Sequence, residues 1–352
     1  MTVSDNDEAQ NLGEDESVVT AVQSGDESAF ASLIEPHRKE LRVHCYRMLG
    51  NFEDAEDLVQ ETFARAWRNR AGFEGRSTFR AWLYRIATNA CLDNIKRNNR
   101  RARTVAVPPT ADRSPSFDEV SWLQPYPDQL LVDTANPTIE PDAVVIARET
   151  IELGFLAAIQ HLSPRPRAVL ILRDVLGWSA SETADALDGT VPAVNSALQR
   201  ARTRLQELGR PGRLEWTPLQ PPTDDERILV QRYMDAHARA DSAAVIELLG
   251  DEVRFSMPPQ EVRFEGRDAV ATFFRDLFGA DNPGDWRLIA TRANGQLAAA
   301  NYIRAWGESQ YRAATLDVFG IEDSTLVEIT TFGPDLFPVF GLPPTLPVTE
   351  LP

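Results

Sequence analysis

The segment spanning residues 163–208 constrains the fold more than any other stretch, because it predicts two short helices around a tight break. Ser179 followed by Glu182 has the spacing of a capping box, which places a helix start at Ser179. Asp188-Gly189 is a turn signal, and Thr190 can cap a second helix. The order helix, turn, helix predicts a helix-turn-helix.

The second of these helices has one apolar face and one polar face. Apolar residues recur every three or four positions from Val194 to Leu208, as in a helix buried along one side. The opposite face carries the amide, hydroxyl and guanidinium groups with which a recognition helix contacts DNA bases and phosphates. These residues are Asn195, Ser196, Gln199, Arg200, Arg202 and Arg204. The alternative is an ordinary helical hairpin with a solvated basic face.

The formal net charge of -17 argues against nucleic acid, but the charge is unevenly distributed along the 352 residues. Residues 30–104 hold 15 basic and 9 acidic side chains, whereas residues 211–352 hold 12 basic and 22 acidic ones. Local patches, rather than the total, govern binding to a polyanion. The basic segment is therefore compatible with DNA binding, and a chain of this length predicts two or three domains.

The two cysteines and the lack of long apolar runs indicate the compartment. Cys45 and Cys91 lie on apolar helical faces without partners at metal-ligand spacing, which predicts buried thiols in a reducing compartment. No apolar run approaches the length of a membrane span, and the acidic N-terminus is unlike a signal peptide. We expect a cytoplasmic protein with no membrane contact, no metal and no cofactor.

Two helices are predicted in the basic segment. Asn51 can cap a helix that begins at Phe52 and whose exposed side is acidic and polar; a solvated acidic face explains that side equally well. A longer helix begins near Ser77 and interleaves aromatic residues with arginines. Such a surface suits unpaired bases, because rings stack on bases and guanidinium groups bind phosphates. A core helix with an exposed basic edge fits the same spacing.

Three stretches of this sequence resemble one family. DAEDLVQETFARAW, FEGRSTFRAWLYRIATNACLDNIKR and LSPRPRAVLILRDVLGWSASETADAL resemble bacterial RNA polymerase sigma factors of the extracytoplasmic-function (ECF) group. The resemblance covers about residues 28–104 and 145–208. It implies a multi-domain fold with two all-α sigma domains: domain 2, a helical bundle, and domain 4, a helix-turn-helix.

The resemblance also implies roles for individual residues. Core RNA polymerase, through the coiled coil of its β′ subunit and through its β subunit, would contact Asp57, Leu58, Val59, Gln60 and Glu61. The −10 promoter element, with one base flipped out of the duplex, would contact Phe73, Arg76, Trp82, Arg85, Asn89, Arg97, Arg100 and Arg101. The −35 element would contact Asn195, Ser196, Gln199, Arg200 and Arg202. Many relatives carry basic residues where this chain has Asn195 and Ala197, so the −35 contacts are expected to be fewer or to differ in preference.

Proline-rich stretches divide the chain into domains. We expect an acidic disordered tail over 1–27, sigma domain 2 over 28–104, a linker over 105–145, sigma domain 4 over 146–210, a second linker over 211–223 and a C-terminal domain over 224–345. Trp122 and Tyr126 make the first linker too bulky in places for a simple spacer. This patch either docks on a neighbouring domain, or occupies a polymerase channel, or is one apolar patch of an extended linker.

The C-terminal residues predict an α+β domain in the order α-α-β-α-β-β-β-β. ELLGDEVRFSMPP and EGRDAVATFF resemble the SnoaL-like branch of the NTF2-like cone fold, which encloses a pocket. The candidate lining residues for a small ligand are Met257, Trp286, Tyr302, Arg304, Trp306, Asp317 and Phe332. We expect His237 on the surface of the first helix, and no acid–base pair for catalysis. The resemblance implies that the domain regulates sigma activity in cis.

The sequence therefore predicts a promoter-specificity subunit that binds core polymerase and promoter DNA and is not an enzyme. Two alternatives stay open. One is a ligand-responsive helix-turn-helix regulator that needs no polymerase-facing helix. The other is an NTF2-like enzyme fused to a DNA-binding module.

Overall fold

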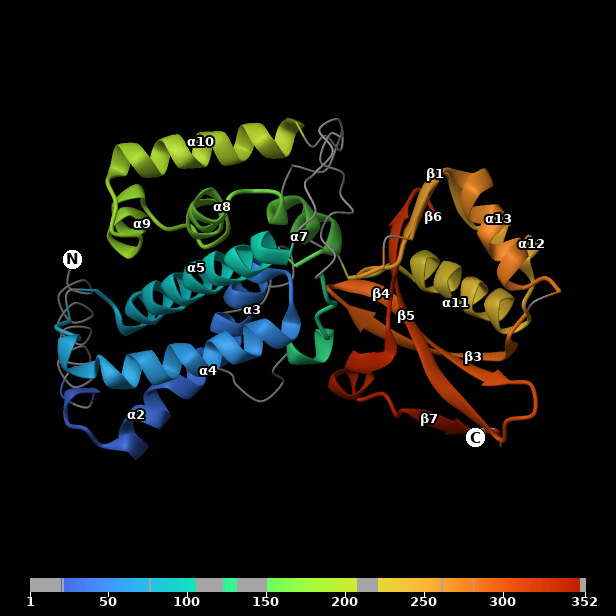
Figure 1. Cartoon of the computed structure of the whole chain (residues 1–352), viewed down its shortest axis with the longest axis horizontal. Helices are drawn as coiled ribbons and strands as arrows, with labels where there is room; N and C mark the ends of the chain where they lie inside the picture. Colours follow the sequence, from blue (N-terminus) through green and yellow to red (C-terminus); the bar gives the residue numbers. More distant parts are fainter. Residues whose placement is uncertain are drawn as a thin grey trace, which may run out of the picture. The chain divides into compact units, whose positions relative to one another are not determined.

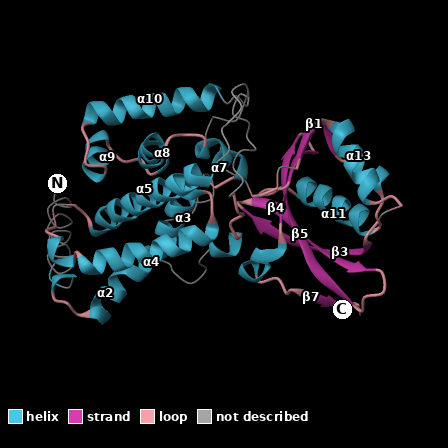
Figure 2. Ribbon diagram, in the orientation of Figure 1, coloured by secondary structure: helices cyan, strands magenta, loops and turns pink. Residues whose placement is uncertain are grey.

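The computed structural model describes residues 20, 22–75, 77–105, 123–131, 151–207, 221–260, 262–280 and 282–348. Within these ranges the chain forms two compact units. The described residues of 20–105 and 158–207 form an all-helical unit, and residues 123–131 and 151–157 with the described residues of 221–348 form a unit built on a β-sheet (Figures 1 and 2). We call them the helical unit and the sheet unit. The predicted fold class, helical domains followed by an α+β domain, is confirmed.

The helical unit consists of two sets of helices. The first comprises α2 (Glu27–Ile34), α3 (Arg38–Leu49), α4 (Phe52–Arg68) and α5 (Phe79–Val105), with short 3-10 turns η1 (Glu35–His37) and η2 (Arg70–Gly72). The second comprises α8 (Pro164–Leu170), the π-helical turn η5 (Ile171–Val175), α9 (Ala180–Ala186) and α10 (Val191–Glu207). Helix α7 (Leu153–Gln160) begins in the sheet unit and ends in the helical unit. Cys45 and Cys91 are buried free thiols, as predicted.

Helix α4 begins where its sequence predicted. Oδ1 of Asn51 accepts a hydrogen bond from the amide of Asp54 at 2.8 Å, which satisfies one of the first-turn amides that lack a helical partner. Gly50 ends α3 in the left-handed conformation, with φ at 71°. A Cβ at Gly50 would also lie 3.1 Å from the Gln160 side chain, so both backbone and packing favour glycine.

The helix-turn-helix has the predicted caps. The Ser179 hydroxyl accepts from the Glu182 amide at 3.1 Å, and the Glu182 carboxylate accepts from the Ser179 amide at 2.7 Å. This is the capping box expected at the start of α9. The predicted apolar face of α10 is buried through Val194, Leu198, Ala201 and Leu205. The helical period therefore fixes which side chains of α10 face solvent.

A buried histidine in the helical unit predicts acid sensitivity. His44 on α3 is fully buried, and its Nε2 lies 2.8 Å from the Thr88 hydroxyl, which itself donates to the Tyr84 carbonyl. Burial, followed by the charges of Arg47 and Arg80, lowers the pKa of His44 from 6.5 to about 3. The unfolded state therefore takes up a proton near pH 6.5 that the folded state refuses until about pH 3.

We therefore expect the free energy of unfolding of the helical unit to fall as pH falls below 6.5. The contribution of His44 is about 1.4 kcal/mol per pH unit. Urea unfolding followed by circular dichroism between pH 5 and pH 7, compared between the wild type and His44→Phe, measures it. The variant should have the shallower slope, and equal slopes would contradict the assignment to His44.

The sheet unit contains a seven-stranded sheet. One face of this sheet is covered by three helices, α11 (Asp224–Ala238), α12 (Ser242–Glu247) and α13 (Arg267–Leu277) (Figures 1 and 2). The strands are β1 (Leu249–Ser256), β2 (Arg263–Glu265), β3 (Gly284–Ala293), β4 (Gln296–Ala305), β5 (Gln310–Glu322), β6 (Thr325–Phe332) and β7 (Thr345–Pro347). The order is β2-β1-β6-β5-β4-β3, with β7 paired to β5, and among the strand pairs of the described residues only β1 and β6 run parallel. The sequence predicted neither β2 nor β7, which are three-residue strands.

Strand register decides which side chains face α11. Trp286 lies opposite Ile303, and Arg287 lies opposite Tyr302, in the β3–β4 pair. Because successive side chains of a strand point to opposite faces, Trp286 and Tyr302 are on different faces of the sheet. The helix-facing side packs against a mainly apolar core that includes Tyr233, Phe274, Phe255, Phe319 and Ile329.

Candidate functional site

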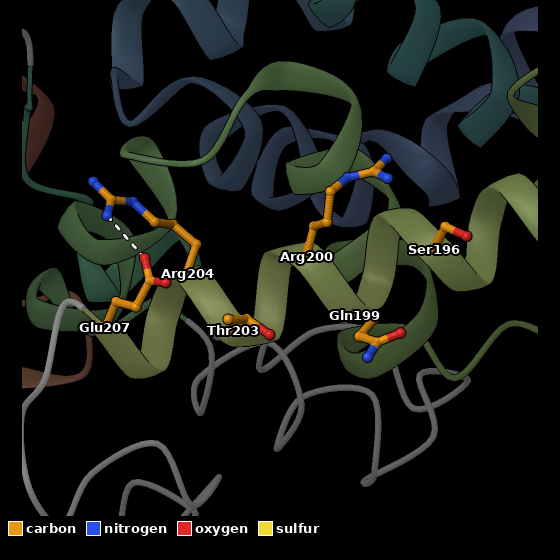
Figure 3. Close-up of a pocket in the computed structure, with 6 residues that line it drawn as sticks. All are labelled: Ser196, Gln199, Arg200, Thr203, Arg204 and Glu207. Atoms are coloured by element: carbon orange, nitrogen blue, oxygen red, sulfur yellow. Dashed lines mark hydrogen bonds and ion pairs between the residues drawn. The ribbon is translucent and has the colours of Figure 1, made fainter.

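The exposed face of α10 carries all five predicted −35 residues: Asn195, Ser196, Gln199, Arg200 and Arg202. Six α10 side chains line a hollow of about 570 Å³: Ser196, Gln199, Arg200, Thr203, Arg204 and Glu207 (Figure 3). The helical period thus gathers hydroxyl, amide and guanidinium groups along one side. This chemistry suits base edges and phosphates.

Two α10 arginines have acidic partners. Nε and Nη2 of Arg202 donate to the two carboxylate oxygens of Asp174, at 2.9 and 2.7 Å, and this bidentate contact raises the pKa of Arg202. Arg204 contacts Glu207 at 3.0 Å, as Figure 3 shows. Arg200 has no ion-pair partner among the residues that the structure describes. It is therefore the α10 cation most directly available to an incoming phosphate.

Helix α5 presents part of the predicted −10 set. Arg85 and Arg97 are exposed, and Trp82 and Asn89 are half-buried. Arg85 contacts Asp188, in the turn before α10, at 2.5 Å. Arg76 and the side chains of Arg100 and Arg101 lie outside the described residues.

Phe73 differs from the other −10 candidates because it belongs to the core. Its side chain is 4% exposed and packs against Phe79 and Trp82, with ring centroids 5.5 and 5.2 Å away. Its carbonyl accepts a hydrogen bond from Gln23 Nε2 at 2.9 Å. Phe73 therefore supports the half-buried Trp82 ring and does not itself present a free face.

The predicted polymerase-contact set on α4 divides between surface and core. Asp57 and Gln60 are exposed, Leu58 and Val59 are buried, and Glu61 is half-buried. Glu61 accepts from Arg65 at 2.8 Å, and this hydrogen bond is the largest cause of a lowered Glu61 pKa. Of the five predicted contact residues, Asp57 and Gln60 therefore form the exposed side of the helix, and Glu61 lies at the edge of that side.

The charge on this face is concentrated near the start of α4. Burial, and after it the negative charges of Asp57 and Glu53, raise the pKa of the nearby Asp54 carboxyl. The positive charge of Arg97 on α5 lowers the pKa of the same carboxyl. The surface around Asp57 is therefore a local negative potential that suits a basic partner.

The structure separates the candidate pocket residues of the sheet unit. Trp286 and Asp317 face α11, whereas Tyr302 is on the other face, where its hydroxyl donates to the Pro343 carbonyl at 2.9 Å. On that second face Arg304 contacts Asp285 and also lies over the Tyr311 ring. Three members remain: Trp306 is 68% exposed, Phe332 is buried, and Met257 packs against the apolar core.

The helix-facing core holds a polar network that the sequence did not predict as a group. Asp317 is 2% exposed and accepts from Tyr233 at 3.0 Å, from Asn301 at 2.7 Å and from Thr331 at 2.7 Å. Burial raises the pKa of the Asp317 carboxyl, against these three hydrogen bonds, which favour its charged form. The network joins α11 to three neighbouring strands.

His237 completes this network, and its predicted surface position is wrong. The ring is 3% exposed, and its Nδ1 lies 3.3 Å from the Tyr233 hydroxyl. Burial lowers the pKa of His237 to about 3, so the ring is neutral at physiological pH. The sequence spacing is consistent with burial of His237, because this residue lies four positions, about one helical turn, after the core residue Tyr233.

A second unpredicted feature is the turn between β3 and β4, residues 292–296, which we call the docking turn. Oδ1 of Asn294 accepts from the Tyr126 amide at 2.7 Å, and Nδ2 of Asn294 donates to the Ile151 carbonyl at 2.6 Å. Arg292 and the Gly295 amide both contact Asp128, at 2.9 and 2.7 Å. One turn thus holds Tyr126 and Asp128, which belong to the predicted linker, and Ile151, which belongs to the predicted sigma domain 4.

The docked segments are buried. Tyr126 and Ile151 are both 0% exposed, and the first amide of α7, at Leu153, donates to Gln296 at 3.1 Å. Three interpretations of the apolar linker patch around Tyr126 were open. The described residues of this patch dock on the neighbouring C-terminal domain. Trp122, which belongs to the same predicted patch, lies outside them.

Within the described ranges, no group of three or more histidine, cysteine or acidic side chains is arranged to hold a metal ion. No helix of these ranges is long and apolar enough to cross a membrane.

Comparisons with known proteins identify the class. The chain matches the models of Sigma-70 region 2 over residues 33–101, Sigma-70 region 4 over residues 153–205 and a SnoaL-like domain over residues 230–329. It belongs to the ECF sigma factors, which direct RNA polymerase in transcription initiation.

Individual relatives cover different parts of the chain. It is 43% identical over 339 residues to the ECF RNA polymerase sigma factor SigG of Mycobacterium tuberculosis, covering 93% of this chain and 89% of that protein. It is 31% identical over 191 residues to SigW of Bacillus subtilis, covering 54% and 93%. The crystal structure of M. tuberculosis SigJ has a similar fold, with a TM-score of 0.55, 22% identity and coverage of 89% and 99%. The predicted family is confirmed.

Proposed function

We propose that the exposed face of α4 is the contact with core RNA polymerase, at the coiled coil of the β′ subunit, with the β subunit as a further partner. The observation that carries this is the exposed pair Asp57 and Gln60 within a local negative potential. Complementary charge across an interface sets register and association rate. Leu58 and Val59 act indirectly, because they hold the helix in the core.

The test is co-purification with core polymerase after the double substitution Asp57→Ala with Gln60→Ala. We expect binding to weaken about tenfold or more, since central interface side chains commonly contribute more than about 1 kcal/mol each. The matched control replaces an exposed aspartate and glutamine on α11, Asp235→Ala with Gln231→Ala. Equal retention of polymerase by both double variants would contradict the proposed contact.

For DNA, we propose that α10 reads the −35 element and that α5 reads the −10 region. Asn195, Ser196, Gln199, Arg200 and Arg202 all lie on the exposed side of α10, which supports direct contact with bases and phosphates. On α5, Arg85 and Arg97 are exposed and Trp82 and Asn89 are half-buried, while Phe73 packs against Trp82. Arg76, in the loop that would capture the flipped base, and Arg100 and Arg101, which would bind backbone phosphates, remain proposed −10 contacts, and the structure describes neither Arg76 nor the side chains of the other two.

We further propose that the C-terminal domain is a binding module that regulates sigma activity in cis, and not an enzyme. Its support is the docking turn, because the segments that Asn294 holds belong to the linker between Sigma-70 regions 2 and 4. A docked linker limits the conformations available to the two promoter-reading regions. As a subunit of RNA polymerase, the protein would act in the cytoplasm.

A further inference from the structure

Asp174 is not among the residues predicted from the sequence, yet it holds one of the proposed DNA-contacting arginines. It lies in the π-helical turn η5, directly after α8, and its side chain is 11% exposed. Its two carboxylate oxygens accept from Nε and Nη2 of Arg202, which lies 28 positions further along the chain on α10. The pair therefore connects η5 to the helix proposed to read DNA.

The π-helical turn gives Asp174 a fixed base. The amide of Leu176 donates to the Ile171 carbonyl at 2.9 Å, and the amide of Trp178 donates to the Leu172 carbonyl, also at 2.9 Å. Ile171 and Leu172 are fully buried, so they anchor the turn in the core. π-helical turns are rare and frequently occur at functional sites. The backbone therefore holds the Asp174 carboxylate in place, and not only its ionic partner.

The contact uses one edge of the Arg202 guanidinium and leaves a second edge unused. A guanidinium carries five N–H groups in a planar fork. Asp174 accepts from Nε–H and from one N–H of Nη2, and no other partner of Arg202 lies among the described residues. One N–H of Nη1 and the second N–H of Nη2 are therefore available side by side, which is the arrangement that binds two oxygens of a phosphate. The Arg202 side chain is 58% exposed, so a ligand can reach this edge.

The position of Arg202 on α10 indicates which DNA group the unused edge meets. Leu198, Ala201 and Leu205 are buried beside it, so Arg202 lies at the border of the exposed face. The middle of that face is formed by the side chains that line the hollow in Figure 3, and Arg202 is not one of them. A recognition helix in the major groove turns the middle of its exposed face towards the bases and its borders towards the flanking backbones. The unused edge therefore fits a backbone phosphate.

We infer that Asp174 is a positioning residue, which orients Arg202 on α10 to bind a phosphate of the DNA backbone. The inference rests on the proposed contact of α10 with DNA and adds the residue that sets this arginine in place. An arginine stem that is already ordered loses less conformational freedom on binding. Because the pair of Asp174 and Arg202 carries no net charge, its phosphate contact contributes position more than counterion release.

Neutralising Asp174 tests the inference through the sign of the effect. Removing a negative charge beside DNA would by itself strengthen binding to a polyanion. We expect the opposite for the full chain carrying Asp174→Asn, about fivefold weaker binding to a fluorescent duplex of mixed sequence, because the freed arginine stem must then be ordered on binding. Fluorescence anisotropy at about 0.1 M salt, where charges are screened over about 10 Å, measures the affinity.

Two further variants are matched to Asp174→Asn. Asp174→Glu keeps the carboxylate and should recover most of the lost affinity. Asp224→Asn makes the same change of charge at an aspartate paired with Arg227 on α11, at 2.6 Å, and should not weaken binding. Unchanged or tighter binding by Asp174→Asn would overturn the inference.

The double variant Asp174→Asn with Arg202→Ala separates positioning from a role in folding. If Asp174 acts through Arg202, its substitution should cause no further loss once Arg202 is alanine. A loss by the same factor in both backgrounds would show that Asp174 supports the fold only, and it would overturn the inference. Arg200→Ala tests the underlying DNA contact. If it weakens binding and Asp174→Asn does not, only the inference fails; if Arg200→Ala and Arg202→Ala both leave binding unchanged, the proposed contact of α10 fails as well.

A second measurement needs no variant at Asp174. The Nε–H signal of Arg202 in NMR spectra, assigned by its absence in Arg202→Ala, should be protected from exchange with water because the carboxylate accepts from it. We expect this protection to persist when the duplex is added. Loss of the protection on DNA binding would mean that Arg202 leaves Asp174 to reach DNA, and the inference would be wrong.

Discussion

Replacing Arg167 with alanine is expected to lower the free energy of unfolding of the helical unit by about 4 kcal/mol. Arg167 is 5% exposed, and its guanidinium donates to the carbonyls of Met48, Gln160 and Leu162 at 2.5, 2.7 and 3.0 Å. It also donates to Oε1 of Gln160. Alanine leaves these buried acceptors without a donor, and each such loss costs about 1–3 kcal/mol.

The charge of Arg167 makes the site unusual. Burial lowers its pKa to about 10, so the side chain is still charged at neutral pH. Among the described residues its hydrogen-bond acceptors are carbonyl and amide oxygens, not carboxylates. Because Met48 belongs to the part matched by Sigma-70 region 2 and Arg167 to the part matched by region 4, one guanidinium links the two regions.

Urea unfolding followed by helical circular dichroism measures the Arg167→Ala effect. The control is Arg204→Ala, which removes an arginine from an exposed ion pair on α10 and should cost less than about 0.5 kcal/mol. Arg167→Lys keeps the charge but not the fork of donors, and should fall between the two. Similar losses for Arg167→Ala and Arg204→Ala would contradict the argument.

Asn294→Gly is expected to release the linker from the docking turn. Glycine tolerates the positive φ of 58° at this position, so the substitution removes the side chain without adding backbone strain. The Tyr126 amide and the Ile151 carbonyl would each lose a buried partner, for a combined cost of about 3 kcal/mol. The open population should rise about a hundredfold, since about 1.4 kcal/mol corresponds to a factor of ten.

Limited proteolysis of the full chain measures that population, because cleavage tracks the open form when opening is fast. Run-off transcription with core polymerase then tests the regulatory proposal, and we expect promoter-directed transcription to increase. Asp323→Gly is the matched control, since Asp323 also has a positive φ, of 46°, in the β5–β6 turn. Faster proteolysis with unchanged transcription would separate docking from regulation and reject the cis-regulatory proposal.

Local pattern explains which features could be predicted from the sequence. The caps at Asn51 and Ser179 and the two faces of α10 depend on neighbours within four positions, so spacing alone determines them. The candidate polymerase-contact face of α4 could likewise be predicted from local spacing. Its division into exposed Asp57 and Gln60 and buried Leu58 and Val59 is a direct result of the helical period.

Features that join distant residues could not be predicted. The Tyr126–Asn294 contact spans 168 positions and Arg85–Asp188 spans 103, and no local periodicity encodes either pairing. The candidate pocket residues of the C-terminal domain lie on two faces of the sheet, and this too could not be predicted from local pattern. Alternation along β4 shows that Tyr302 and Arg304 share a face, but only the register between strands shows that Trp286 is on the other one.

The pairing of Arg85 with Asp188 and of Arg202 with Asp174 bears on how promoter binding responds to ionic strength. Free arginines that meet phosphates release condensed cations from DNA, and each released cation steepens the dependence of affinity on salt. An arginine that leaves a carboxylate for a phosphate exposes a new anion, which recruits a cation of its own. The count of arginines at such an interface therefore overstates the number of ions set free.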